Sequence, residues 1–205
     1  MFYRVLTDTR MTDLRSLQTA LRLLHQVYTV PNIVISSIPL RDWLLECLPE
    51  DIRPGTASDD GHLLCISSSA THTEGSGTSS VHAATVPTIP GYFSGVGDLF
   101  SALVLAHFDP SGDSLQPKES PVSAAASQAL TKTHGILSLT HEHALTLPEE
   151  DRLPTDEELD VKEPMRKIRR MRGRELRLIQ GQDIIRGTKK VEERKMQPWK
   201  GFWDT

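Results

Sequence analysis

Residues 87–108 read PTIPGYFSGVGDLFSALVLAHF, and this stretch decides the expected fold class. From Leu99 onward, eight of ten positions are apolar, and only Ser101 and His107 interrupt the run. A helix that is apolar on nearly all sides is typical of a protein interior. We therefore expect a buried helix over residues 98–108.

Three glycines, Gly91, Gly95 and Gly97, lie just before this helix, and Asp98 opens it. The first N–H groups of a helix are unbonded and carry partial positive charge, and glycines let the backbone approach a ligand closely. Gly95-Val96-Gly97 is therefore predicted to form an anion hole for a phosphoryl group. The carboxylate of Asp98 could accept a proton from an attacking hydroxyl there, as phosphoryl transfer to an alcohol requires.

The G-x-G-D motif also fits a plain structural interpretation, a tight turn whose Asp caps a helix. The motif alone leaves the two interpretations about equal. No Lys-Ser/Thr pair follows the glycines, so the loop is not a Walker loop. The third glycine of the dinucleotide-binding fingerprint is also missing.

The segments before this stretch alternate between helical and extended patterns. Leucines recur at spacings of three and four after Asp13, which predicts an amphipathic helix that Thr12 or Asp13 caps. Ile33-Val34-Ile35 is apolar on both faces, which is typical of buried parallel strands. We therefore expect an α/β fold with a mostly parallel sheet. Its expected elements are helices at 13–28, 42–48, 98–108 and 122–139, and strands at 33–37, 62–67, 81–86 and 175–180.

Charge is distributed unevenly along the 205 residues, whose formal net charge is −4. Residues 1–150 carry 8 Lys/Arg and 16 Asp/Glu, whereas residues 151–205 carry 15 and 11. Segments at 68–80 and 110–121 are rich in Ser, Thr, Gly or Pro and are expected to be loops. We expect one domain over 1–145, a charged and flexible insert over 146–174, and a terminal strand and tail of the same domain over 175–205.

The composition argues against several classes of protein. The hydrophobic share is 38%, below the usual ~45–50%, and the apolar runs are far shorter than the ~20 residues of a membrane span. The N-terminus lacks the pattern of a secretory signal. Two cysteines, Cys47 and Cys65, give no disulfide framework. We expect an intracellular, cytoplasmic protein without a membrane partner, with the nucleus kept open as a second location.

Three further features have a structural and a functional interpretation. The His-Glu-His sequence at 141–143 lacks the i, i+4 spacing of a helical metal site, so we expect a solvated segment. The basic run at 166–177 lacks aromatic residues and follows acidic sequence, so we expect a solvated insert rather than a nucleic-acid site. The aromatic residues Trp199, Phe202 and Trp203 are expected to pack on the body of the protein.

The stretch YFSGVGDLFSALVLAHF resembles the C-terminal signature of pyridoxal kinases in the ribokinase-like superfamily, especially the fungal ones. Two more stretches resemble the family in the same order, TDTRMTDLRSLQTALRLLHQVYTVPNIVISSIPL at 7–40 and RELRLIQGQDI at 174–184. The resemblance implies a ribokinase-like fold. It also implies transfer of the γ-phosphate of ATP to the 5′-hydroxyl of pyridoxal, pyridoxine or pyridoxamine, with Mg²⁺, in vitamin B6 salvage.

The resemblance also assigns roles to residues. Asp98 matches the family's catalytic base, and Gly95, Val96 and Gly97 match its anion hole. Many relatives have Thr at the position of Val96, so one side-chain contact is missing here. Asp at position 98, instead of Cys, favours a pyridoxal kinase over the related hydroxymethylpyrimidine kinases. The positions that match ATP-contacting residues are Ser36, Ser37, Ile89, Pro90 and Gly91.

The resemblance leaves part of the family chain unmatched. The N-terminal part of the family normally supplies the first strands, the vitamer-binding residues and an Asn-x-x-Glu motif that organises Mg²⁺ and phosphate. We therefore expect an incomplete sheet with an open edge and an exposed apolar face, poor solubility or dependence on a partner, and little or no kinase activity. ATP and B6 vitamers are the expected ligands, and a homodimer is compatible with the family. The alternative is a non-catalytic nucleotide-binding or interaction fragment with a charged tail.

Overall fold

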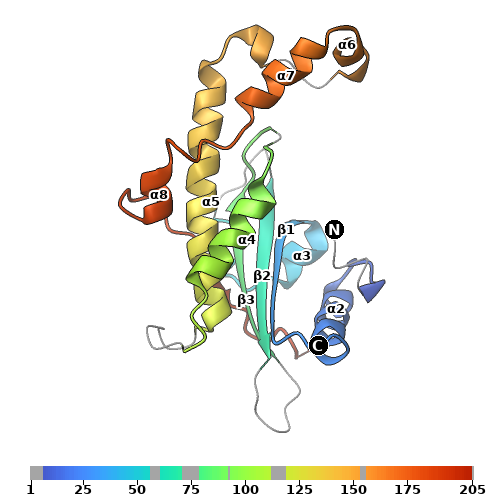
Figure 1. The fold of residues 1–205 in the computed structure, drawn as a ribbon. Coiled ribbons are helices and arrows are strands. Elements are labelled where there is room, and N and C mark those ends of the chain that lie inside the picture. Colours follow the sequence, from blue (N-terminus) through green and yellow to red (C-terminus); the bar gives the residue numbers. More distant parts are fainter. Residues whose placement is uncertain are drawn as a thin grey trace. The chain divides into compact units, whose positions relative to one another are not determined.

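The computed structural model describes residues 7–55, 61–70, 79–91, 93–111, 119–152 and 156–204 (Figure 1). The central parts of the expected loops, 71–78 and 112–118, lie outside the described residues. The chain divides into two compact units. Unit 1 comprises Met1–Thr88, Val104–Gln128 and Arg194–Thr205, and unit 2 comprises Ile89–Leu103 and Ala129–Glu193.

Unit 1 contains a four-stranded sheet in the order β1-β2-β3-β4. The strands are β1 (Asn32–Pro39), β2 (His62–Ala70), β3 (Ser79–Pro87) and the short β4 (Gln197–Pro198). The three strands expected before residue 90 are therefore confirmed. Among the described residues β1 pairs with β2 alone, which leaves its second edge without a partner there.

The α/β class is confirmed, but the expected parallel direction of the strands is not. Each pairing between neighbours of this sheet is antiparallel. Burial of both faces suggested parallel strands, because parallel sheets are usually covered on both sides. In β2, Leu64 and Ile66 join the main core, while Cys65 alternates to the opposite face and is also buried. The strand β2 is thus buried on both faces although it pairs with its neighbours in the antiparallel direction.

The main core of unit 1 lies between one face of the sheet and two helices, α2 (Leu14–Gln26) and α3 (Asp42–Cys47). The leucine stripe of α2 is buried, as its spacing predicted. Asp13 is the N-cap of α2. The tail also enters this core, since Trp199 and Phe202 are buried in it, so the expected packing of the terminal aromatic residues is confirmed.

The glycine-preceded helix, α4 (Val96–His107), forms as expected, but it is not buried on all sides. Only Phe100 and Leu103 are buried, and Leu105 is 78% exposed. The apolar sequence correctly indicated that α4 has few polar side chains. Burial of a helix also depends on neighbouring elements that cover it, and the sequence of the helix does not contain this information. The following helix, α5 (Pro121–Thr146), extends beyond the expected 122–139.

Unit 2 contains helices where the sequence predicted a charged and flexible insert over 146–174. They are the 3₁₀ helix η1 (Glu149–Asp151), α6 (Glu157–Lys162) and α7 (Pro164–Gly173). A further helix, α8 (Gln182–Arg186), lies in the expected terminal segment. The strand expected at 175–180 is not formed, because local turn bonds replace a ladder: the Gly181 N–H donates to the Arg177 carbonyl (2.8 Å). Glu175 alone makes a single parallel bridge, to Ser94. The division into a domain, an insert and a tail stays a prediction.

Candidate functional site

The glycine loop ends where α4 begins. Gly95 has a φ of +82°, a left-handed conformation that favours glycine. Its carbonyl accepts the first helical hydrogen bond, from the Leu99 N–H (3.0 Å). Val96, Gly97 and Asp98 therefore occupy the first turn, where backbone N–H groups have no partner within the helix. This exposed turn has the donors and the partial positive charge that suit a bound phosphoryl group.

The carboxylate of Asp98 is exposed in this first turn. Within the described part of the chain, its side chain makes no hydrogen bond and no ion pair. A capping Asp would accept a hydrogen bond from a backbone N–H of the same turn. The structure therefore does not support the interpretation of Asp98 as a helix cap, and leaves the carboxylate available to a ligand.

A distant segment supports the loop from the side. Ser94 forms a parallel bridge with Glu175, and a Cβ added to Gly95 would meet Leu176 Cδ1 at 4.0 Å. This support was missed at the sequence level, although RELRLIQGQDI was recognised as a similar segment. The resemblance of residues 174–184 to the family pointed to this segment, but its pattern predicted a strand at 175–180 and not a contact with the glycine loop.

The residues expected to line the base and ribose of a nucleotide, Ile89, Pro90 and Gly91, precede the loop in unit 2. Ile89 is half-buried, whereas Pro90 and Gly91 are exposed. Gly91 has a φ of +116°, so this position also favours glycine. An exposed segment with one half-buried apolar side chain is compatible with contact to a flat ring. The structure brings these residues into the same unit as Asp98.

Ser36 and Ser37 lie in β1, in unit 1. The pairing register shifts between Ile35 and Ile38, so these two serines oppose a single residue of β2. Such a β-bulge re-aims side chains locally, and both serines are exposed. Ser37 has a φ of 60°, an unfavourable value for a residue other than glycine. Their contact with ATP stays a prediction.

The described residues offer no cluster of three or more His, Cys, Asp or Glu side chains that could hold a metal ion. Kinases usually hold Mg²⁺ with one or two carboxylates and the phosphates of the substrate, so a cluster of this size is not required and the expected Mg²⁺ stays a prediction. No mechanistic step is therefore assigned to a metal. None of the helices in the described ranges is long and apolar enough to cross a membrane.

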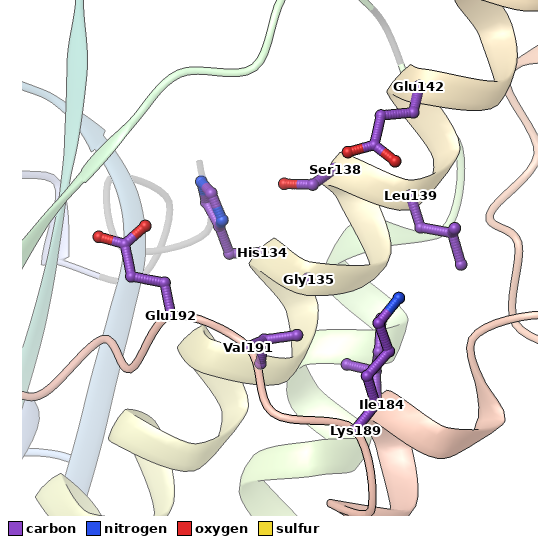
Figure 2. A pocket seen from close by; sticks show the side chains of 9 residues that line it. All are labelled: His134, Gly135, Ser138, Leu139, Glu142, Ile184, Lys189, Val191 and Glu192. Atoms are coloured by element: carbon purple, nitrogen blue, oxygen red, sulfur yellow. The ribbon is translucent and has the colours of Figure 1, made fainter.

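A pocket of about 210 Å³ lies elsewhere in unit 2, between α5 and the segment that contains α8. Figure 2 shows its lining side chains, which are His134, Gly135, Ser138, Leu139, Glu142, Ile184, Lys189, Val191 and Glu192. None of the residues to which the resemblance assigns a role lines it, although Ile184 belongs to the similar stretch 174–184. It is therefore distinct from the glycine loop.

An exposed glycine loop at the start of a helix, carried by an α/β fold, is compatible with a phosphate-binding protein. Comparison with known proteins narrows this class to the fold of pyridoxal kinases. Pyridoxal kinase from Leishmania donovani, solved with ADP and pyridoxamine, matches with a TM-score of 0.59 at 20% identity, over 96% of this chain and 48% of that one. The Trypanosoma brucei pyridoxal kinase matches with a TM-score of 0.56 at 18% identity, over 95% of this chain and 48% of that one.

Sequence comparison points to the same group of proteins, the pyridoxal kinases. Two Schizosaccharomyces pombe proteins, each named "putative pyridoxal kinase", are similar to the chain. One is 28% identical over 161 residues, covering 77% of this chain and 45% of that protein. The other is 27% identical over 205 residues, covering 95% and 52%. No family model matches the chain. The resemblance to pyridoxal kinases is confirmed, and the chain spans about half the length of these relatives.

Proposed function

We propose that this chain is the nucleotide-side part of a pyridoxal kinase, which transfers the γ-phosphate of ATP to the 5′-hydroxyl of a B6 vitamer. The observation that carries the proposal is the exposed first turn of α4, in which Gly95 precedes free N–H donors and the Asp98 carboxylate has no partner among the described residues. The solved pyridoxal kinase with ADP and pyridoxamine has the same fold, which supports the proposal.

In the proposed mechanism, the N–H groups of Val96, Gly97 and Asp98 bind the phosphoryl oxygens and stabilise the negative charge of transfer. The Asp98 carboxylate accepts the proton of the attacking hydroxyl. Ser36, Ser37, Ile89, Pro90 and Gly91 are proposed to contact the rest of ATP. Phosphoryl transfer needs alignment of both substrates, and the family's vitamer-binding residues lie in the part that this chain does not match. The isolated chain is therefore expected to bind nucleotide but to transfer little or no phosphate.

Nucleotide binding tests the loop directly. We would titrate the chain with a fluorescent ATP analogue and compare Gly95→Ala with Gly55→Ala, a glycine that has open space around it and no positive φ. Gly95→Ala forces Ala into a left-handed conformation and should weaken binding about tenfold, because the first turn moves. Gly55→Ala should bind like the original chain. Absence of binding, or equal binding by both variants, contradicts the proposal.

The role of Asp98 is tested separately. Asp98→Asn should leave nucleotide affinity unchanged or tighten it, because it removes a negative charge beside the phosphate. In a kinase assay with pyridoxal, any transfer by the original chain should disappear in this variant. Transfer that persists in Asp98→Asn excludes Asp98 as the base. Efficient transfer by the 205-residue chain would contradict the expectation of little activity.

A further inference from the structure

Helix α7 turns two of its arginines, Arg166 and Arg170, toward its neighbour α6. Arg166 and Arg170 both bind the Asp160 carboxylate of α6, with N–O distances of 3.2 Å for Arg166 Nη1 and 2.8 Å for Arg170 Nη1. Arg170 also donates from Nη2 to the second carboxylate oxygen. Arg170 and Gly173 are the buried residues of the helix. These two arginines therefore hold α7 against α6.

The opposite face of α7 carries apolar side chains into solvent. Met165, Ile168 and Met171 are 55%, 42% and 51% exposed. Their spacing of three residues places them on one side of the helix, which we call the outer face of α7. Exposed apolar side chains that are grouped in this way commonly mark a surface that contacts another molecule.

Cations flank the outer face. Lys167, Arg169 and Arg172 are exposed, and in the described part of the chain their side chains have no ion pair or hydrogen bond. Residues 164–173 include no acidic residue. The surface therefore combines a short apolar ridge with three free positive charges.

Although the sequence analysis expected no membrane partner, we propose that the outer face of α7 binds the surface of an anionic phospholipid membrane, lying along the surface without crossing it. Apolar side chains can enter the boundary between headgroups and acyl chains, while the long cationic side chains reach the phosphates. Lys167, Arg169 and Arg172 have no acidic partner in the described part of the chain. The phosphate groups of anionic lipids would supply one. This inference is independent of the proposed kinase function.

Two other occupants fit less well. A second copy of the chain would bring the same cations together across the contact, where like charges repel. A protein partner would need an acidic side chain opposite each of the three cations, whereas an anionic lipid surface supplies negative charge at every position. Lipid demands apolar contact and charge without directional pairing, which is what this face provides.

Nearby acidic residues set the conditions for binding. Glu157 and Glu158 of α6 are exposed and carry the same charge as the lipid. They weaken the attraction, so binding should require a membrane rich in anionic lipid. It should also weaken strongly at high salt, because exposed charges are screened.

The test is co-sedimentation of the full 205-residue chain with vesicles. We expect binding to phosphatidylcholine vesicles that contain roughly 40% phosphatidylserine, and none to phosphatidylcholine alone. Replacing Lys167, Arg169 and Arg172 by Gln should lower the partition coefficient on the order of 100-fold, because each cation near an anionic surface contributes to binding. Replacing Ile168 and Met171 by Gln should lower it at least about tenfold, because buried apolar area contributes to binding.

Matched variants separate this surface from charge and hydrophobicity in general. The control for charge replaces Arg15, Lys190 and Lys200, which are exposed, by Gln. The control for apolar area is Ile179→Gln, at a side chain that is 77% exposed. Both controls should bind within about twofold of the original chain. Absence of binding to anionic vesicles, equal binding to neutral vesicles, or unchanged binding by the α7 variants would overturn the proposal. If the natural partner of this face is a protein instead of a membrane, the chain should not bind anionic vesicles.

Discussion

At the scale of single residues, the structure tolerates backbone strain at Ser37, one of the residues expected to contact ATP. Ser37 adopts a φ of 60° within the bulge of β1. A left-handed conformation costs a residue with a Cβ roughly 1–2 kcal/mol. Strained backbone of this kind persists where the surrounding structure imposes it, and it is frequent at functional sites. The strain at Ser37 is thus an observation in favour of its proposed contact with ATP.

Replacement of this serine measures the strain. Ser37→Gly should raise stability relative to Ser36→Gly by about 1 kcal/mol, because only position 37 has a left-handed backbone. Denaturant unfolding of the two variants measures the difference, and both serines are exposed, so no core contact is lost. If the site also binds ATP through the hydroxyl, Ser37→Gly should bind the nucleotide more weakly while it unfolds at higher denaturant. Equal stabilities would show that Ser37 carries no strain.

At the scale of elements, sequence patterns predicted the position of those helices and strands that depend on local residues alone. The leucine stripe and the cap residues located α2, and the apolar runs located β1, β2 and β3, because these signals belong to each segment alone. Strand direction, the exposed face of α4 and the support of Ser94 by Glu175 depend on neighbours far along the chain. Periodicity carries no information about them. The glycine loop was found because a helix start and its glycines are adjacent in sequence.

The capping box of α2 gives a test at this scale. The Asp13 carboxylate accepts a hydrogen bond from the Ser16 N–H (2.7 Å), and Ser16 Oγ accepts one from the Asp13 N–H (3.1 Å). This backbone hydrogen bond is the main cause that lowers the pKa of Asp13. The ionised cap therefore stabilises the fold above the pKa of the unfolded carboxyl. Its contribution is lost as pH falls through the lower pKa of the folded state.

We expect Asp13→Ala to lower the melting temperature at pH 7, and to lower it less as pH falls below about 4. Thermal unfolding followed by circular dichroism across this pH range measures the difference. Glu46→Ala is the control, since it removes an exposed acid from α3 without removing a cap. A melting temperature of Asp13→Ala that equals that of the control at pH 7 would show that the cap contributes nothing.

At the scale of the molecule, the core of unit 1 joins the two ends of the described chain. Phe202 is 2% exposed and packs edge-on against Trp199, with ring centroids 5.0 Å apart. Its carbonyl accepts a hydrogen bond from Gln18 Nε2 in α2. The tail is thus part of the core. Among the described residues, β1 has an open edge and Leu105 in α4 is exposed. The expected poor solubility or dependence on a partner stays a prediction, which a monodisperse, cooperatively melting monomer would contradict.

Truncation of the buried ring measures what the tail contributes. Phe202→Ala should lower the free energy of unfolding by about 3–5 kcal/mol, because it removes a large buried side chain and leaves a cavity. Phe202→Leu should cost less, since it refills most of the space. Urea unfolding followed by tryptophan fluorescence measures both. Equal stability of the Ala variant and the original chain would mean that the tail is detached from the core in solution.

The packing of the tail also sets the order in which unit 1 can fold during synthesis. Leu17 and Phe202 belong to one core, so the helix α2 leaves the ribosome long before its aromatic neighbours exist. Contacts so distant in sequence form slowly, and partly folded chains expose apolar surface in the meantime. Unit 1 therefore completes its core only after residue 202 has been made. A nascent chain arrested before that point should depend on chaperones.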